Sequence, residues 1–326
     1  MPPKGYPMKA VWLENNALNL RDVPQPQNCH EALVKVRLAG VCGTDLEMVR
    51  GYYPFTGIPG HEFVGEVVPQ SLETLPSDWI GKRVVGEINA ACGSCEQCRG
   101  GRPTHCENRS VLGIKNRDGV FAEYVNLPLE NLHRVPDSVS DEMAVFTEPL
   151  AAALEIHQQV QIQPTDRILL IGAGRLGQLI AQTLALTGAG LRVLARHPLQ
   201  KKLLVDRGIK LIDEAEIQPW RWDVVVEATG STGGFEIARQ AIRPCGTLVL
   251  KSTYKGEMTL NLSSIVVDEI NIVGSRCGPF APALRLMEQK MVDPTVLIAA
   301  EFGLSEALTA FEKAAKTGML KVLVRP

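Results

Sequence analysis

Aromatic residues and charge of one sign are both scarce in this sequence, and each shortage excludes a class of protein. Aromatic residues make up only 5% of the 326 residues, so the core must rest on Val, Leu, Ile and Ala. Neither charge sign dominates, because 34 basic and 36 acidic side chains leave a formal net charge of −2. This balance provides no basic footprint for nucleic acid and no polybasic patch for a membrane surface.

Long hydrophobic runs are also missing. The stretch from Ile168 to Ala173 is soon followed by Arg175, far short of the ~18 apolar residues that predict a membrane-spanning helix. The first residues, MPPKGYPMKA, lack the apolar core of a signal peptide, so we expect a cytoplasmic protein. With 45% hydrophobic and 21% charged residues, the composition is that of a globular protein, and at ~150 residues per domain the length predicts about two domains.

The two halves of the chain have different hydrophobic patterns. Gly and Pro divide the first half into short apolar runs, which predicts a β-rich domain with many turns; the runs are 32–38, 63–68, 83–87 and 120–127. The pattern changes near Glu148, and from Asp166 onward strand-like and helix-like segments alternate. We expect strands at 167–171, 191–195, 210–212, 223–227, 247–251 and 271–274, with helices at 175–186, 199–207, 234–242 and 263–267.

Continuous apolar strands that alternate with helices predict an α/β domain, with a doubly wound parallel sheet covered on both faces. After Gly278 the pattern predicts helices at 282–290 and 305–316 and a final strand at 321–324. This tail is too short to fold alone, so we expect it to pack on the first domain.

A glycine-rich loop follows the first of these apolar strands. Gly172, Gly174 and Gly177 fit the G-x-G-x-x-G pattern, with Arg175 and Leu176 between the last two glycines. The loop follows the strand RILLI and opens a helical run, the context in which this pattern indicates dinucleotide binding rather than an ordinary turn. The glycines would allow a tight turn, close approach of the pyrophosphate, and packing of the helix on the strand, while the helix N-terminus would supply N–H groups.

The end of the second strand of this domain bears on the choice of cofactor. An acidic residue normally stands there to bind the ribose hydroxyls of NAD. This chain has Leu194-Ala195-Arg196 instead, and a guanidinium suits a 2′-phosphate. We therefore expect NADP to be favoured over NAD, the alternative being that Arg196 is simply a solvated loop residue.

Four of the eight cysteines lie within fifteen residues, and they are Cys92, Cys95, Cys98 and Cys106. In a cytoplasmic chain, such clustering indicates a metal site rather than disulfides. Four thiolates from one loop provide the closed tetrahedral coordination of structural zinc, and we favour zinc over an iron–sulfur cluster. We expect this lobe, about residues 90–108, to have a stabilising role.

A second metal site is suggested by residues farther apart. Cys42 lies in GVCGTD, His61 and Glu62 in GHE, and Glu148 in TEPLA. Each alone is uninformative, since a lone Cys or His usually belongs to the core. Together they provide a thiolate, an imidazole and carboxylates, which is the ligand mix of a catalytic zinc with an exchangeable position.

These motifs, in this order, resemble the zinc-dependent medium-chain dehydrogenases of the alcohol, sorbitol and threonine dehydrogenase superfamily. The resemblance spans essentially the whole chain and includes GVCGTD, GHEFVGEV, the four-cysteine lobe, GKRVVGE, FAEYV, TEPLA and the glycine loop. It implies a GroES-like catalytic domain at residues 1–150 and 278–326, a Rossmann domain at residues 151–277, and a cleft between them. It also implies a homodimer or homotetramer, with 271–274 as a possible edge for pairing.

The resemblance further implies roles for individual residues. Cys42 and His61 would ligate a catalytic zinc, and Glu148 or Glu62 would supply the third ligand, directly or through water. Thr44 would take the proton of the substrate alcohol. Asp45 would accept a hydrogen bond from His61, and Arg276 falls loosely where polyol dehydrogenases place a substrate-side arginine. Many members have His at the position of Glu47, so this end of the proton relay departs from the family.

We therefore predict an NAD(P)-dependent, zinc-containing dehydrogenase with two zinc ions per subunit. Its substrate would be a small polyol or sugar, oxidised to a ketone or aldehyde. A 3-hydroxy amino acid such as threonine, or a simple alcohol, is the alternative. A different class, a zinc-stabilised, NADP-binding redox sensor or scaffold without catalysis, is disfavoured because Cys42, Thr44, His61 and Glu148 are all present.

Overall fold

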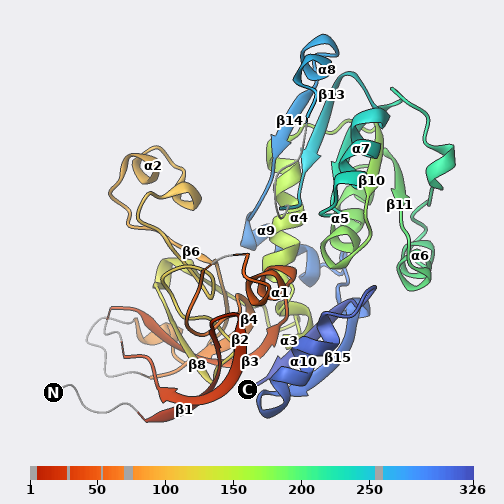
Figure 1. The fold of residues 1–326 in the computed structure, drawn as a ribbon. Coiled ribbons are helices and arrows are strands. Elements are labelled where there is room, and N and C mark those ends of the chain that lie inside the picture. Colours follow the sequence, from red (N-terminus) through yellow and green to blue (C-terminus); the bar gives the residue numbers. More distant parts are fainter. Residues whose placement is uncertain (1–5, 28–29, 53, 70–75, 254–259) are drawn as a thin grey trace. The chain divides into compact units, whose positions relative to one another are not determined.

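The chain separates into two units that are each built around a β-sheet (Figure 1). The computed structural model describes residues 6–27, 30–52, 54–69, 76–253 and 260–326. The first unit comprises Met1–Glu148 and Leu284–Pro326, and the second comprises Pro149–Ala283. No helix in these described ranges is both long and apolar enough to cross a bilayer.

The first unit contains a seven-stranded sheet in the order β15-β16-β3-β4-β5-β9, with β8 also paired to β3. Its central strand β3 is apolar except for Lys35 and Arg37, the two exposed positions, so most of the strand is buried. The strands are β3 (Ala32–Gly40), β4 (Glu62–Val67), β5 (Arg83–Gly86), β8 (Tyr124–Leu127), β9 (Leu132–Arg134), β15 (Ile298–Gly303) and β16 (Lys321–Arg325).

Two further strand pairs and several short helices complete this unit. The hairpin β1 (Pro7–Glu14) and β2 (Ala17–Pro24) is antiparallel, as is the pair β6 (Asn89–Ala90) and β7 (Ser110–Val111). The helices are α1 (Gly43–Val49), α2 (Glu96–Arg99), α3 (Asp141–Ala144) and α10 (Ala307–Ala314). Single 3₁₀ turns lie at η1 (Ser77–Trp79), η2 (Pro103–His105), η3 (Leu129–Asn131), η5 (Thr295–Leu297) and η6 (Leu304–Glu306).

The C-terminal segment is part of the first unit's sheet. β16 pairs antiparallel with β3 and parallel with β15, and α10 packs on both β15 and β16. The predicted tail helices correspond to α9 (Phe280–Glu288) and α10, and the predicted last strand to β16. β15 was not predicted, because its sequence IAAEFG alternates weakly and is only half-buried.

The second unit contains a fully parallel five-stranded sheet in the order β11-β10-β12-β13-β14. Its inner strand β10 has the burial expected of a strand covered on both faces, since all but Arg167 are buried. The strands are β10 (Arg167–Ile171), β11 (Gly190–Leu194), β12 (Trp222–Glu227), β13 (Ile242–Leu250) and β14 (Asn271–Gly274). The helices are α5 (Arg175–Ala185), α6 (Pro198–Val205), α7 (Thr232–Ala241), α8 (Leu262–Val267) and the single turn η4 (Glu214–Glu216), while α4 (Thr147–Gln159) begins at the unit boundary.

Some predicted elements differ from the observed ones. The predicted strand at 210–212 is wrong: it forms only an isolated bridge between Leu211 and Val193, because Asp213 already caps η4. The predicted strand at 120–127 is shortened to β8, since residues 119–121 bond to the 58–60 loop instead. α4 and the β1–β2 hairpin were not predicted.

Candidate active site and metal centres

The pairing of β3 with β4 brings the first predicted metal ligands together. These strands are antiparallel, with Gly40 opposite Glu62. Cys42 follows the end of β3 by two residues, and His61 directly precedes β4, so both lie at the same end of the strand pair. Ligand atoms of Cys42, His61 and Glu62 all lie within 4.8 Å of one another.

Asp45 orients this cluster from the first turn of α1. Its Oδ2 accepts a hydrogen bond from the Cys42 backbone N–H at 2.8 Å, and its Oδ1 lies 3.3 Å from Nδ1 of His61. Asp45 and His61 are both buried. Because Nδ1 faces Asp45, Nε2 is the ring nitrogen left to bind a metal, which is how carboxylates fix metal-binding histidines.

The electrostatics of the cluster favour a cation. Burial lowers the pKa of His61, but the charges of Asp45 and Cys42 raise it more, so that the pKa lies well above its usual value. Thiolate, imidazole and carboxylate oxygen form a donor set that suits Zn²⁺. Thr44 lies beside it, with its Oγ1 3.8 Å from Sγ of Cys42. The residues present therefore fit a catalytic zinc with a hydroxyl group next to it.

Glu62 has a second partner that the sequence did not reveal. Its Oε2 accepts a short hydrogen bond from Nζ of Lys321, the first residue of β16, and both side chains are buried. The same Nζ lies 3.5 Å from the carbonyl of Val41 and 5.6 Å from the Phe146 ring centroid. The only sequence signal is a lysine within the apolar segment MLKVLV, and such a lysine is buried only when paired.

The remaining predicted residues of this region lie elsewhere. Glu148 is partly buried in the first turn of α4 and is not one of the three clustered ligands. Glu47 is on α1, where its Oε1 accepts from Arg50 at 2.5 Å. Arg276 is exposed in the second unit, between β14 and α9, with its Nη1 3.4 Å from Sγ of Cys277.

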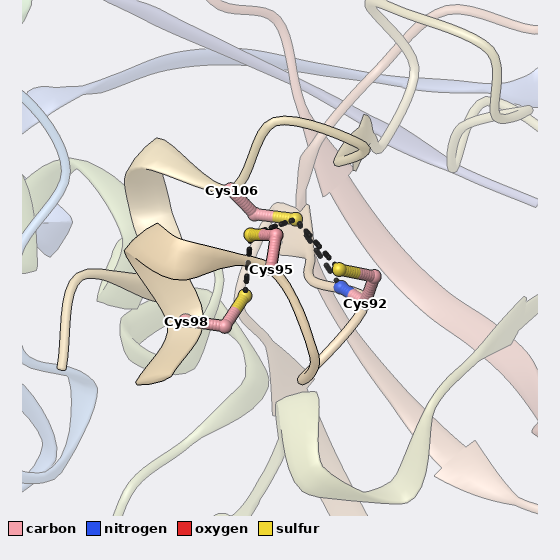
Figure 2. A group of neighbouring side chains, drawn as sticks. All are labelled: Cys92, Cys95, Cys98 and Cys106. Atoms are coloured by element: carbon pink, nitrogen blue, oxygen red, sulfur yellow. Dashed lines mark hydrogen bonds between the residues drawn. The ribbon is translucent and has the colours of Figure 1, made fainter. Parts of the chain in front are cut away.

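The four-cysteine lobe converges as predicted, and Figure 2 shows the four sulfurs turned toward one another. Cys95 Sγ lies 3.5 Å from Cys98 Sγ and 3.8 Å from Cys106 Sγ, and Cys106 Sγ lies 3.5 Å from Cys92 Sγ. Sulfurs arranged tetrahedrally at about 2.3 Å from a zinc ion are about 3.8 Å apart. All four are free thiols rather than disulfides, so this geometry fits a structural zinc.

The thiol acidities in this lobe point to the same conclusion. Hydrogen bonds from Ser94, first from its backbone, lower the pKa of Cys92 to about 5, and backbone bonds at Cys98 and Glu107 lower that of Cys95. Desolvation and the neighbouring sulfurs of Cys95 and Cys106 raise the pKa of Cys98 to about 12. The four thiols thus differ in acidity, and a bound cation such as zinc would favour the thiolate form of all of them.

In the second unit, the glycine loop has the geometry of a phosphate cradle. Gly172 has φ of +102°, and a Cβ on Gly177 would lie 2.2 Å from the Gly172 carbonyl, so both positions require glycine. A Cβ on Gly174, the N-cap of α5, would meet nothing within 4 Å. Open space above the loop at a helix N-terminus is what a pyrophosphate needs.

One arginine lies within this loop and another follows the neighbouring strand β11. Nη1 of Arg175 is buried and has no hydrogen-bond partner in the described ranges. Arg196 is exposed just beyond β11 and makes no side-chain hydrogen bond or ion pair to the described residues. Gln178 ties the loop to α6, because its Nε2 donates to the carbonyls of Ala173 and Gln200. The glycine loop and the N-terminus of α5 therefore fit the pyrophosphate of a dinucleotide.

Comparisons with known proteins identify dehydrogenases that are similar to this chain. Residues 28–137 match the alcohol dehydrogenase GroES-like domain. A sorbitol dehydrogenase of Halalkalibacterium halodurans is 30% identical over 94% of this chain and 95% of its own length. An L-threonine 3-dehydrogenase of Shewanella sediminis is 30% identical over 82% of this chain and 81% of its own length. A zinc-binding dehydrogenase of Sinorhizobium meliloti, solved with NADP, is 29% identical with a TM-score of 0.90, covering 98% of this chain and all of that one.

Proposed function

The chain belongs to the zinc-dependent medium-chain dehydrogenase superfamily, and from this premise we propose that it oxidises a hydroxyl group of a polyol or sugar at a zinc held by Cys42, His61 and Glu62. It is a zinc- and nicotinamide-dependent alcohol or polyol dehydrogenase that transfers a hydride between a small alcohol and NAD(P). The observation that carries the site assignment is the convergence of three ligand types next to the Thr44 hydroxyl. The second zinc would be held by the four-cysteine lobe.

Different residues of the chain would bind the metal, transfer the proton and orient the ligands. A zinc ion bound at this cluster would polarise the substrate oxygen and lower the pKa of the alcohol. The Thr44 hydroxyl accepts the substrate's proton and passes it outward, while Asp45 keeps His61 in the tautomer that binds metal. We assign the release of that proton to solvent to Glu47, which lies three residues after Thr44 on α1 and is partly exposed. Glu148 remains the alternative to Glu62 as the third ligand, directly or through water.

We also propose which residues bind each phosphate group of the cofactor. We assign the pyrophosphate to Gly172, Gly174, Arg175, Leu176 and Gly177, and we place a 2′-phosphate at Arg196, which would favour NADP. Two observations support this preference for NADP. No carboxylate stands at the end of β11, and the Arg196 guanidinium there is exposed.

The experiment is a zinc analysis combined with a substrate panel. Zinc per chain is measured by mass spectrometry, and reduction of NADP⁺ and NAD⁺ is followed with polyols, sugars, threonine and simple alcohols. We expect two zinc ions per chain and turnover of at least one polyol or sugar. Cys42→Ser should remove one zinc and reduce kcat/KM by roughly a thousandfold.

The exposed Cys245 provides the matched control, because Cys245→Ser should change neither zinc content nor turnover. If Cys42→Ser kept full turnover, the zinc assignment would be wrong. Turnover of threonine instead of polyols would favour the second candidate, a 3-hydroxy amino acid dehydrogenase, for which the Shewanella relative is the supporting observation.

We also propose that the chain forms a homodimer or homotetramer through the edge of its parallel sheet. β14 is one of the two edge strands of this sheet among the described residues, and Ile272 on it is exposed. The neighbouring helix α8 exposes Leu262, Val266 and Val267, whose exposed fractions are 66%, 75% and 79%. Exposed apolar side chains and a strand at the edge of a sheet are features that subunit pairing buries.

A further inference from the structure

Three glycines of the first unit meet directly beside His61. Gly60 precedes this histidine in the chain, whereas Gly113 and Gly119 belong to the loop between β7 and β8. A Cβ on Gly113 would lie 2.2 Å from the Gly60 carbonyl oxygen, and a Cβ on Gly119 would lie 2.2 Å from the same atom. Two backbone segments therefore close on one carbonyl group, at positions where a side chain has no room.

Hydrogen bonds join the same two segments. The backbone N–H groups of residues 119–121 donate in turn to the carbonyls of Ile58, Gly60 and Pro59, at 2.6, 3.1 and 3.2 Å. The carboxylate of Asp118 adds a bond at 2.9 Å, in which its Oδ1 accepts from the Ile58 N–H. The three residues before the candidate histidine ligand are thus bonded, one by one, to a loop that is distant in sequence.

The Gly60 carbonyl matters because it belongs to the peptide bond that leads into His61. A peptide group is planar, so its carbonyl oxygen lies in one rigid plane with the N–H and the Cα of the next residue. Fixing the oxygen therefore fixes the direction in which the His61 side chain leaves the backbone. That direction decides metal binding, since Nδ1 must face Oδ1 of Asp45, 3.3 Å away, for Nε2 to be left for the metal.

The Gly60 backbone has little room to move. Gly60 has φ of +100° and Gly113 has φ of +63°, and residues with a side chain rarely adopt such conformations. Gly60 also lies against the fully buried ring of Phe121, because a Cβ on Gly60 would be 2.6 Å from Cδ2 of that ring. The ring in turn packs edge-on against Phe311 of α10, with the ring centroids 5.1 Å apart. Gly60 is therefore enclosed by backbone on one side and by an aromatic pair on another.

We propose that Gly113 and Gly119 are positioning residues for the catalytic metal, because they hold the Gly60–His61 peptide in the orientation that lets His61 bind zinc. The proposal rests on the catalytic zinc site proposed above. A methyl group at either glycine must displace the Gly60 carbonyl, since the atom it meets is backbone and not the end of a flexible side chain. Groups that orient metal-binding histidines are typically worth about ten- to a hundredfold in metal affinity.

Zinc release to a competing chelator tests the proposal, using the full chain loaded with zinc. The release step that Cys42→Ser removes belongs to the catalytic ion, and the other step reports the four-cysteine lobe. We expect Gly113→Ala and Gly119→Ala to raise the dissociation constant of the catalytic ion about ten- to a hundredfold and to leave that of the lobe ion unchanged. Gly81→Ala is the matched control, because Gly81 has φ of +75° but its Cβ would meet nothing within 4 Å.

The outcomes distinguish the zinc site from the role of the glycines. If Cys42→Ser removes no release step, the proposed zinc site is wrong and the positioning role falls with it. If that step is present but unchanged in both glycine variants, the zinc site stands and the positioning role is refuted. Equal weakening of both ions, or weakening of the catalytic ion in Gly81→Ala as well, shows a general effect on folding and also overturns the role.

A milder variant applies if circular dichroism shows that both glycine variants fail to fold. Asp118→Ala removes only the hydrogen bond to the Ile58 N–H and introduces no clash. Weaker binding of the catalytic ion alone in this variant supports the positioning role. An unchanged dissociation constant of that ion contradicts it.

Discussion

At the scale of single residues, the charged groups of the candidate centre are buried with partners that reduce the cost of burial. Asp45 is held by the Cys42 N–H and faces His61, and Glu62 is paired with Lys321. A buried charge without such a partner is strongly destabilising. Lys321 therefore acts as a positioning residue for Glu62, because its ammonium group binds one of the two carboxylate oxygens.

We predict that Lys321→Met lowers the free energy of unfolding of the zinc-depleted protein by about 3 kcal/mol, because Glu62 loses its buried partner. Added Zn²⁺ should restore more stability than it gives the wild type, since the Glu62 carboxylate no longer has to share its charge with Lys321 when it binds the ion. Denaturant unfolding with and without Zn²⁺ measures both effects. Lys316→Met, at an exposed lysine nearby in sequence, is the control. Equal zinc stabilisation in Lys321→Met and wild type would contradict the link between Lys321 and Glu62.

Arg196 provides a second prediction at this scale. Arg196→Asp should reduce kcat/KM for NADP⁺ by about a hundredfold, because a carboxylate replaces the guanidinium that would bind the 2′-phosphate. The kcat/KM for NAD⁺, measured on the same variant, serves as the internal control and should stay the same or rise. A wild-type enzyme that uses NAD⁺ better than NADP⁺ would show that Arg196 is only a solvated loop residue.

At the scale of elements, the four-cysteine lobe depends on its ligands because it has almost no core. It contains the short helix α2, the turn η2 and the strands β6 and β7, each two to four residues long. Cys106 is buried, but Cys92 is exposed, and α2 has no buried residue. Elements this short do not persist without a crosslink, and a bound zinc would supply it.

We therefore predict that Cys95→Ser lowers the zinc content by one ion per chain and increases proteolytic cleavage within residues 92–106 about tenfold. Cleavage sites identified by mass spectrometry localise the effect, and Cys245→Ser again serves as the control. Turnover should fall less than in Cys42→Ser, since no residue of the lobe belongs to the catalytic cluster. A variant that keeps both zinc ions and resists protease would show that Cys95 is not a ligand.

At the scale of the whole molecule, the two units differ in the direction of their strands, and each type of sheet brings functional groups together in a different way. The first unit's sheet is mostly antiparallel and brings residues from distant parts of the chain together, such as Glu62 and Lys321. The second unit's sheet is fully parallel and presents the α5 N-terminus at the end of β10. Its strand β14 ends the sheet beside the exposed apolar residues of α8.

We predict that Val266→Asp shifts the protein to a smaller assembly, because a charge in the middle of a buried apolar contact is costly. Light scattering coupled to size-exclusion chromatography measures the mass. Val205→Asp, at an exposed valine on α6, should leave the mass unchanged. A wild-type protein that is already a monomer at micromolar concentration would refute this interface.

Much of the fold and of the site could be predicted from local sequence. The apolar strands of the parallel sheet, the helix after the glycine loop and the four-cysteine lobe depend on neighbouring residues, so that periodicity and spacing were enough to predict them. The strand at 210–212 was predicted wrongly, because a short apolar run does not show whether Asp213 will cap a turn and end it. β1, β2 and β15 were missed, since their burial depends on partners that are distant in sequence.

The sequence alone thus determined which ligand types are present and the order of the domains' motifs, because those are local properties. Only the tertiary structure decided which of these residues meet. The antiparallel register of β3 and β4 placed Cys42 beside His61, and the pairing of β16 with β3 placed Lys321 on Glu62. The physical reason is that strand register is set by long-range hydrogen bonding and by burial of one sheet face, neither of which a single stretch of sequence contains.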